Sequence, residues 1–377
     1  MTTTWTAAFR SAVLSPGESF SFKEPRGFAG QTLRQILHLD GGGEALRVLL
    51  TNRFGDRPLV VAAARVALRK SGDEILPGTD APLTFGGAAE VTLAPGAEVA
   101  SDAVPLAVGA GTDLAVSLYL PEETGPATYS HSPLETGYVA EGDAVSASSL
   151  PAAEEVDSRF FITGVDVLAP EGTAVAVAFG DSWFEGAGTT HGANRRFPNL
   201  LNARLERGWV VNQGLGGNRL LTDEVGLHGL ARFDRDVLSV PGATHVLLHF
   251  GLNDIGLASA NGDRPPSADD LTAGFAELAR RARDAGLTVI GGTMGPYLGT
   301  IYPGVDTPEG QVVRRAVNDW IRTSGVFDAV VDYAHAVADP GQPDAIRPDL
   351  DSGDHLHPND AGAQAMADAV DLAFLRL

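Results

Sequence analysis

The sequence contains no cysteine. This absence excludes thiolate catalysis, cysteine-ligated zinc sites and disulfide scaffolds. Lysine is nearly absent as well, because Lys23 and Lys70 are the only two, and both lie far in sequence from the motifs described below. No lysine is therefore an obvious candidate for a Schiff base, which disfavours pyridoxal chemistry.

Long apolar runs are also missing, so the sequence predicts no transmembrane helix. Residues 1–5 lack the basic region and the apolar stretch of a secretory signal. We therefore expect a cytoplasmic protein from the sequence as it stands, and a secreted one if this sequence is a trimmed mature form.

Positive charge is scarce, since 27 Lys and Arg residues stand against 48 Asp and Glu residues and the formal net charge is -21. Phosphate backbones and anionic lipid headgroups repel such a chain, so we expect no nucleic acid and no membrane as partners. The 377 residues, 44% of them hydrophobic, are enough to bury a substantial core and exceed the usual size of one domain. Two domains are therefore expected.

Residues 1–168 have the pattern of an all-β domain, because apolar residues recur with period two in short stretches between glycine and proline. Residues 33–39 and 46–50 flank the glycine-rich segment 40–43 and predict a β-hairpin. Further strands are expected at residues 59–68, 91–93, 114–120 and 160–167. The sequence thus predicts a jelly-roll-like β-sandwich, an accessory domain, over residues 1–168.

Residues 169–377 alternate apolar runs with amphipathic stretches, which is typical of a doubly wound α/β domain. The apolar runs predict five parallel strands at residues 174–179, 209–211, 245–250, 287–290 and 329–331. Helices are expected at residues 197–207, 224–238 and 271–283, with capping starts at Ser267 for the third and at Thr307 for a fourth. In a last helix, the alanines expected to pack on the sheet are Ala361, Ala365, Ala369 and Ala373.

Polar motifs follow the first three apolar runs directly, at residues 180–182, 212–218 and 251–254, and a fourth motif, 354–358, precedes the last helix. In doubly wound sheets, ligands bind beyond the carboxyl ends of the strands. All four motifs are therefore expected to meet at one edge of the sheet.

Ser182, Asp354 and His357 supply a nucleophile, an orienting carboxylate and a base for acyl transfer. An imidazole suits the role of base because its ordinary pKa lies near neutrality. Asp354 lies three residues before His357 and is expected to orient its ring, while Pro358 keeps His357 out of helical geometry. The alternative for Ser182 is a turn or cap serine at the start of a helix.

Three donors are candidates for an oxyanion hole: the backbone N–H groups of Ser182 and Gly217 and the side-chain amide of Asn253. The alternative for Gly217 and its neighbouring glycines is a flexible turn with positive φ. The alternative for Asn253 is a loop residue that bonds to its own backbone.

The loop with His355 and His357 has two possible interpretations from the sequence. Asp354, His355 and His357 fit a metal cluster as well as an acid–base loop, although no other His-rich segment completes a metal shell, and we expect neither a metal nor a cofactor. His245 and His249 lie on one face of an apolar run and are expected to be buried, hydrogen-bonded strand residues.

The four motifs resemble those of the SGNH or GDSL hydrolases, which share a flavodoxin-like sheet and act as esterases, lipases, thioesterases and carbohydrate deacetylases. By this resemblance, which covers about residues 174–375, Ser182 matches the nucleophile and Asp354 with His357 the acid–base pair. Gly217 and Asn253 match the oxyanion-hole glycine and asparagine. The resemblance implies an SGNH catalytic domain over residues 169–377. No Gly-x-Ser-x-Gly elbow surrounds Ser182, which argues against an α/β-hydrolase.

Longer stretches, such as residues 188–201 and 231–238, resemble an actinobacterial-type branch of the family with an N-terminal β-sandwich. The chain departs from the family at Trp183-Phe184-Glu185, where a smaller aliphatic residue and a polar-acidic pair are usual. We therefore infer no substrate preference for this chain from the family.

The leading hypothesis is a serine esterase that hydrolyses short-chain acyl or acetyl esters, including those of carbohydrates or natural products, through an acyl-Ser182 intermediate. The partner is then a small-molecule or carbohydrate ester. One alternative is an acyltransferase that passes the acyl group to a sugar or natural-product hydroxyl. Another is a carbohydrate-binding protein with a degenerate catalytic half, in which Trp5, Tyr119, Tyr129 and Tyr138 stack on sugars.

Overall fold

The computed structural model describes residues 2–18 and 20–375, and the chain divides into two compact units after Thr173. The boundary that the sequence predicts, between residues 168 and 169, lies inside strand β15 (Ile162–Pro170). That the two units are an accessory and a catalytic domain stays a prediction. No helix in the described ranges is long and apolar enough to cross a membrane.

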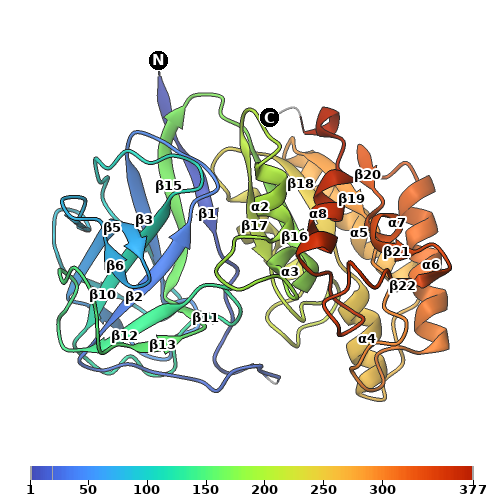
Figure 1. Ribbon diagram of the computed structural model, residues 1–377, viewed down its shortest axis with the longest axis horizontal. Coiled ribbons are helices and arrows are strands. Elements are labelled where there is room, and N and C mark those ends of the chain that lie inside the picture. The colour runs from blue at the N-terminus through green and yellow to red at the C-terminus, as the bar shows by residue number, and fades with distance from the viewer. Residues whose placement is uncertain (1, 19, 376–377) are drawn as a thin grey trace. The chain divides into compact units, whose positions relative to one another are not determined.

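The first unit is all β, as the sequence predicts, and consists mainly of two antiparallel sheets (Figure 1). One sheet has the strand order β1-β15-β3-β9, and the other has the order β13-β12-β2-β10-β5-β6, with β7 paired to β5. Besides β15, the strands of these two sheets are β1 Thr3–Arg10, β2 Gln31–His38, β3 Leu46–Thr51, β5 Ala63–Ser71, β6 Glu74–Ile75, β7 Ala81–Pro82, β9 Glu98–Ala100, β10 Asp113–Leu120, β12 Gly137–Glu141 and β13 Glu154–Val156. Two short pairs complete the unit: β4 (Leu59–Val61) with β8 (Val91–Leu93), and β11 (Tyr129–Ser130) with β14 (Arg159–Phe160).

The predicted hairpin is wrong, because β2 and β3 belong to different sheets: β2 pairs with β10 and β12, whereas β3 pairs with β15 and β9. The glycines between them serve close backbone contacts instead of a tight turn. A Cβ on Gly42 would lie 2.6 Å from the carbonyl oxygen of Val108, and one on Gly43 would lie 2.6 Å from that of Leu168. Glycine is needed here because a neighbouring backbone fills the space of a side chain.

The second unit has a sheet of five parallel strands in the order β17-β16-β18-β19-β20. The strands are β16 (Val175–Gly180), β17 (Trp209–Gly214), β18 (Ala243–His249), β19 (Thr288–Gly292) and β20 (Ala329–Val331). Counted along the unit, this is the order 2-1-3-4-5 of a flavodoxin-like sheet, so the predicted doubly wound fold and its five strands are confirmed. A small hairpin, β21 (Ala338–Asp339) and β22 (Gln342–Ile346), lies outside this sheet.

Helices follow the strands, and Figure 1 shows α2 and α8 side by side. Their bounds are α1 Ser182–Glu185, α2 Phe197–Asn202, α3 Gly229–Phe233, α4 Leu252–Ala260, α5 Ala268–Asp284, α6 Pro308–Thr323, α7 Tyr333–Val337 and α8 Asp360–Asp368. A π-helical turn, Asp234–Leu238, continues α3, and a 3-10 turn, Leu372–Phe374, follows α8. Both predicted caps form: Ser267 and Asp270 make a capping box, and the Thr307 hydroxyl accepts the Gly310 amide.

The helix predictions need correction at four points. Helix 224–238 begins only at Gly229, because the Asn218 side chain donates hydrogen bonds to the carbonyl oxygens of Val225 and Leu227 and holds that segment as a loop. The helix expected at 197–207 ends at Asn202, and α4 was not predicted. In the last helix, the fully buried alanines are Ala363 and Ala367, whereas those expected to pack on the sheet are partly or well exposed.

Candidate active site

Ser182 lies at the end of β16, at the first residue of α1. The Asp181 carboxylate caps α1 by accepting the Trp183 amide at 3.1 Å, and Gly186 ends the helix with a φ of 108°. Gly180 precedes this turn, and a Cβ there would lie 2.7 Å from the carbonyl oxygen of His249 on β18. The turn therefore packs tightly on the sheet and holds the Ser182 hydroxyl at the carboxyl end of β16, with the residue only 9% exposed.

His357 lies against this hydroxyl, although 175 residues separate the two in sequence. Its Nε2 is 2.9 Å from Oγ of Ser182, and its Nδ1 is 2.6 Å from Oδ2 of Asp354. The structure thus brings the three predicted residues into one hydrogen-bonded chain from hydroxyl to imidazole to carboxylate. This is the geometry in which an imidazole can take a proton from serine while a carboxylate orients the ring.

The side-chain carboxylate of Asp354 receives five hydrogen bonds. Its Oδ1 accepts from the backbone N–H groups of Leu356 and His357 and from the Ser352 hydroxyl, while Oδ2 accepts from His357 Nδ1 and from the Tyr302 hydroxyl. Partial burial by itself raises the pKa of Asp354, but the hydrogen bond and charge of His357 and the two backbone donors hold that pKa well below its usual range. The carboxylate therefore stays ionised when it faces the imidazole.

Of the three predicted oxyanion donors, the Ser182 N–H lies on the turn after β16, and Gly217 and Asn253 lie on the segments that follow β17 and β18. The Leu215 amide donates to Gly180 O at 3.1 Å, which ties the glycine-rich segment to the end of β16. Asn253 lies at the start of α4 and donates to Asn218 O at 3.1 Å, which leaves its second amide hydrogen. Within residues 2–18 and 20–375, neither the Ser182 nor the Gly217 backbone N–H donates a hydrogen bond. Their role as oxyanion donors stays a prediction.

Trp183 connects the turn at Ser182 to the loop of residues 354–358, which carries His357 and is called the acid–base loop below. Its indole Nε1 donates to the carbonyl oxygen of Leu356, the residue before His357, at 3.1 Å. The indole also stacks on the His249 ring, with centroids 5.2 Å apart and planes at 19°. His249 in turn contacts Asp181 Oδ1 at 3.0 Å through Nδ1. Trp183, His249 and Asp181 are almost completely buried, which confirms His249 as a buried strand residue.

Sequence reasoning missed three buried ionisable groups around this site. Arg232 on α3 donates to the carbonyl oxygens of Gly180 and Gln213, at the ends of β16 and β17, so it holds the two strand ends together. Glu185 accepts the Gly216 amide at 2.9 Å, and Asp254 accepts the amides of Leu220 and Leu221. Arg232 and Asp254 lie inside a predicted helix and a predicted motif, and Glu185 stands where the chain departs from the family pattern, but none of these positions by itself indicates burial.

Burial sets the protonation of these two acids. It raises the pKa of Glu185 to about 8, although the Gly216 hydrogen bond and the charges of Arg196 and Arg232 oppose the rise. It likewise raises the pKa of Asp254 to about 6, against its two backbone hydrogen bonds. Both acids support loops of the site and take the protonated form more readily than exposed carboxyls.

The alternative metal cluster finds no support in the geometry. His355 pairs through Nδ1 with Asp351, whereas His357 pairs with Asp354. No group of three His, Asp or Glu side chains in the part of the chain that the structure describes is arranged to hold a metal ion.

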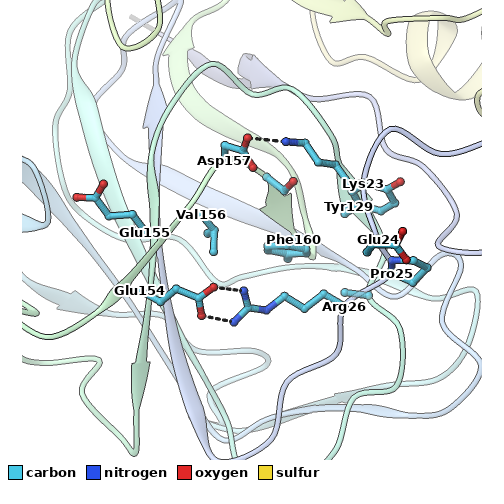
Figure 2. A pocket seen from close by; sticks show the side chains of 12 residues that line it. Lys23, Glu24, Pro25, Arg26, Tyr129, Glu154, Glu155, Val156, Asp157 and Phe160 are labelled. Carbon is cyan, nitrogen blue, oxygen red and sulfur yellow. Dashed lines mark hydrogen bonds and ion pairs between the residues drawn. The ribbon is translucent and has the colours of Figure 1, made fainter.

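A separate hollow of about 230 Å³ lies in the first unit (Figure 2). Lys23 pairs with Asp157 at 2.5 Å, and Arg26 forms two hydrogen bonds of 2.7 Å to Glu154, so two ion pairs cross it. Of the aromatic residues proposed to stack on sugars, Tyr129 lines this hollow but is only 4% exposed. A carbohydrate-binding role of this unit stays a prediction.

A family model described as GDSL-like lipase/acylhydrolase family matches residues 178–365. This part of the chain belongs to that family. The match contains all five predicted site residues, and the GDSL-like domain identifies the protein as a hydrolase.

Solved structures of GDSL-type and carbohydrate esterases are similar to this chain. A GDSL-like lipase from Bacteroides thetaiotaomicron is 19% identical, with 55% of this chain and 89% of that chain covered and a TM-score of 0.43. A carbohydrate acetylesterase from Sinorhizobium meliloti is 15% identical, with coverages of 54% and 99% and a TM-score of 0.43. A carbohydrate esterase family 2 enzyme plus carbohydrate binding domain from Corynascus thermopiles is 13% identical, with coverages of 99% and 98% and a TM-score of 0.42. No curated protein matches the chain in sequence.

Proposed function

We propose that this GDSL-type hydrolase is a serine esterase that cleaves short-chain carboxylic esters through an acyl-Ser182 intermediate. The observation that carries the proposal is the hydrogen-bonded chain from Ser182 Oγ through His357 to Asp354, with distances of 2.9 and 2.6 Å. A serine hydroxyl in such a chain is activated as a nucleophile because a base lies ready to take its proton.

In the first half of the proposed reaction, Ser182 Oγ attacks the ester carbonyl carbon while its proton moves to His357 Nε2. The carbonyl oxygen becomes negative and is bound by the backbone N–H groups of Ser182 and Gly217 and by the Asn253 amide. His357 then gives its proton to the alcohol oxygen as the carbon–oxygen bond breaks, and the alcohol leaves.

In the second half, a water molecule attacks the acyl-enzyme, and His357 takes one of its protons. Collapse of the second tetrahedral intermediate returns that proton to Ser182 and releases the carboxylic acid. Asp354 stays ionised throughout and stabilises the imidazolium, which agrees with the lowered pKa of its carboxyl group.

The decisive variant is Ser182→Ala, which removes only the hydroxyl oxygen. We expect hydrolysis of p-nitrophenyl acetate to fall by at least about 10⁴-fold, because the remaining donors cannot form an acyl-enzyme. A fluorophosphonate should label wild-type Ser182, as mapped by mass spectrometry, and should not label the variant. Ser324→Ala, an exposed serine after α6, is the matched control. Full activity of Ser182→Ala would contradict the proposal.

The same acyl-enzyme can pass its acyl group to an alcohol in place of water, which is the transferase alternative. Product analysis with and without added sugars separates the two. Acetylated sugar in the products would favour transfer, and free acid under every condition would favour hydrolysis.

A further inference from the structure

Two large apolar side chains are exposed beside the acid–base loop. Ile301 is 61% exposed and Tyr302 is 43% exposed, and they follow each other in the segment between β19 and α6. Single exposed apolar residues are ordinary, whereas neighbouring ones next to a reactive group favour a binding surface. Among the described residues of this unit, the other large exposed hydrophobics are Val312 and Phe374.

This segment is attached to Asp354 by three hydrogen bonds. The Ile301 amide and the Thr300 hydroxyl both donate to the backbone carbonyl oxygen of Asp354 at 3.1 Å. The Tyr302 hydroxyl donates to Oδ2 of the same residue at 3.2 Å. Ile301 and Tyr302 are therefore held in register with the carboxylate that orients His357.

The Tyr302 ring also lies next to the His357 ring, with centroids 6.4 Å apart and planes at 80°. In the proposed reaction, His357 must reach the alcohol oxygen to protonate it, so whatever flanks the imidazole faces the alcohol part of the ester. The oxyanion donors come from other segments, after β16, β17 and β18. A surface attached to the imidazole side is thus placed for the leaving group.

We propose that Ile301 and Tyr302 form an alcohol subsite that selects esters whose alcohol part has a broad apolar face, such as an aryl or other cyclic alcohol. This inference rests on the proposed esterase function and adds the substrate class. A ring packs against the exposed parts of both side chains, whereas a methyl group covers little of either. The Tyr302 hydroxyl has a second task, because it positions the Asp354 carboxylate.

The subsite predicts which kinetic constant changes. The alcohol is still attached while the acyl-enzyme forms and has left before the acyl-enzyme is hydrolysed. Apolar contacts to it therefore act on kcat/KM, whereas the hydrogen bond from Tyr302 to Asp354 serves both half-reactions and acts on kcat as well.

The test compares phenyl acetate with methyl acetate, which share the acyl group, as the ratio of their kcat/KM values. This ratio is independent of the fraction of active enzyme. We expect Ile301→Ala, Ile301→Ser and Tyr302→Ala to lower the ratio by about 3- to 10-fold, in line with the loss of one ring contact. Tyr302→Phe keeps the ring, so it should keep the ratio within about 2-fold while lowering kcat for both esters. Val312→Ala, an equally exposed residue on α6, is the control and should change neither quantity.

Two failures can be told apart. If wild-type enzyme hydrolyses neither ester, or if Ser182→Ala retains full activity, the esterase proposal fails and the subsite fails with it. If wild-type enzyme is active but the ratio is unchanged in both Ile301 variants and in Tyr302→Ala, the subsite alone is refuted. An unchanged kcat in Tyr302→Phe would refute the positioning role of the hydroxyl.

Discussion

Gly295, which follows β19, has no side chain, and the Trp183 indole occupies the space that a side chain there would fill. A Cβ built on Gly295 would lie 2.6 Å from Cζ3 of Trp183 and closer still to Cη2 and Cζ2. Carbon atoms in contact lie about 3.5–4.0 Å apart, so Gly295→Ala must move the indole by more than about 1 Å or shift the backbone beneath it. Both residues are buried, and the His249 ring stacks on the indole and restricts its movement on that side.

The structure allows the size of the effect to be estimated. Overpacking a buried site by one methyl group costs about 1–3 kcal/mol of unfolding free energy. The same displacement pulls on the 3.1 Å hydrogen bond from Trp183 to Leu356 O, next to His357. A misplacement of about 1 Å in a catalytic group lowers turnover by about 100-fold. Gly295→Ala should therefore reduce both stability and kcat, although Gly295 takes no part in the proposed chemistry.

A double-mutant cycle with Trp183→Leu tests this reasoning by urea denaturation. Leucine lacks the ring atoms that the new Cβ would strike, so the double variant should lose at least about 1 kcal/mol less than the sum of the two single variants. Gly341→Ala is the control, because it is exposed and its Cβ meets its nearest atom, Asp339 Oδ1, at an ordinary 3.4 Å. If the two losses add within about 0.5 kcal/mol, the indole does not fill the space over Gly295 and the argument is refuted.

Two further predictions concern the oxyanion donors and the buried acids. Asn253→Ala should lower kcat for p-nitrophenyl acetate by about 10²- to 10³-fold with little change in KM, because its amide acts mainly on the developing oxyanion. Asn261→Ala, at the exposed end of α4, is the control. An unchanged kcat with a raised KM would contradict the role of Asn253. Glu185→Gln should stabilise the fold increasingly as pH rises. The folded-state pKa of about 8 lies above the ordinary 4.5, so the stabilising protonated form is fully present below pH 4.5 and its contribution is lost as pH rises toward 8. At 1.36 kcal/mol per pH unit, the unfolding free energy of the variant relative to wild type should rise by at most about 4 kcal/mol between pH 5 and pH 8, as measured by urea titrations. If this difference in unfolding free energy stays constant with pH, Glu185 ionises normally.

The order of elements in the second unit could be predicted because each parallel strand buries both faces. A strand such as β16 must then be a short continuous apolar run, and the polar residue after it must lie at the carboxyl edge of the sheet. Ser182 and Asn253 could be found as candidates on this basis. His357 could be found because it stands three residues after a carboxylate in a non-helical segment.

The failures share one cause, which is that local periodicity does not specify a partner. The alternation in β2 and β3 is the same whether they pair with each other or with other strands, and the pairing depends on β10 and β15, which lie far along the chain. Helix α3 begins late because the side chain of Asn218 takes two carbonyl groups of the preceding segment. Such contacts leave no trace in a hydropathy pattern.

By itself, the sequence determined the fold class, the five strands of the second unit and the residue types available for acyl transfer, because burial on a sheet and the positions of polar motifs are encoded over a few neighbouring residues. Only the tertiary structure decided that Trp183 bonds to the acid–base loop, that Glu185 and Asp254 are buried, and that Tyr302 bonds to Asp354. These contacts join residues that lie 31 to 173 positions apart, and they form because the carboxyl ends of parallel strands bring distant loops together.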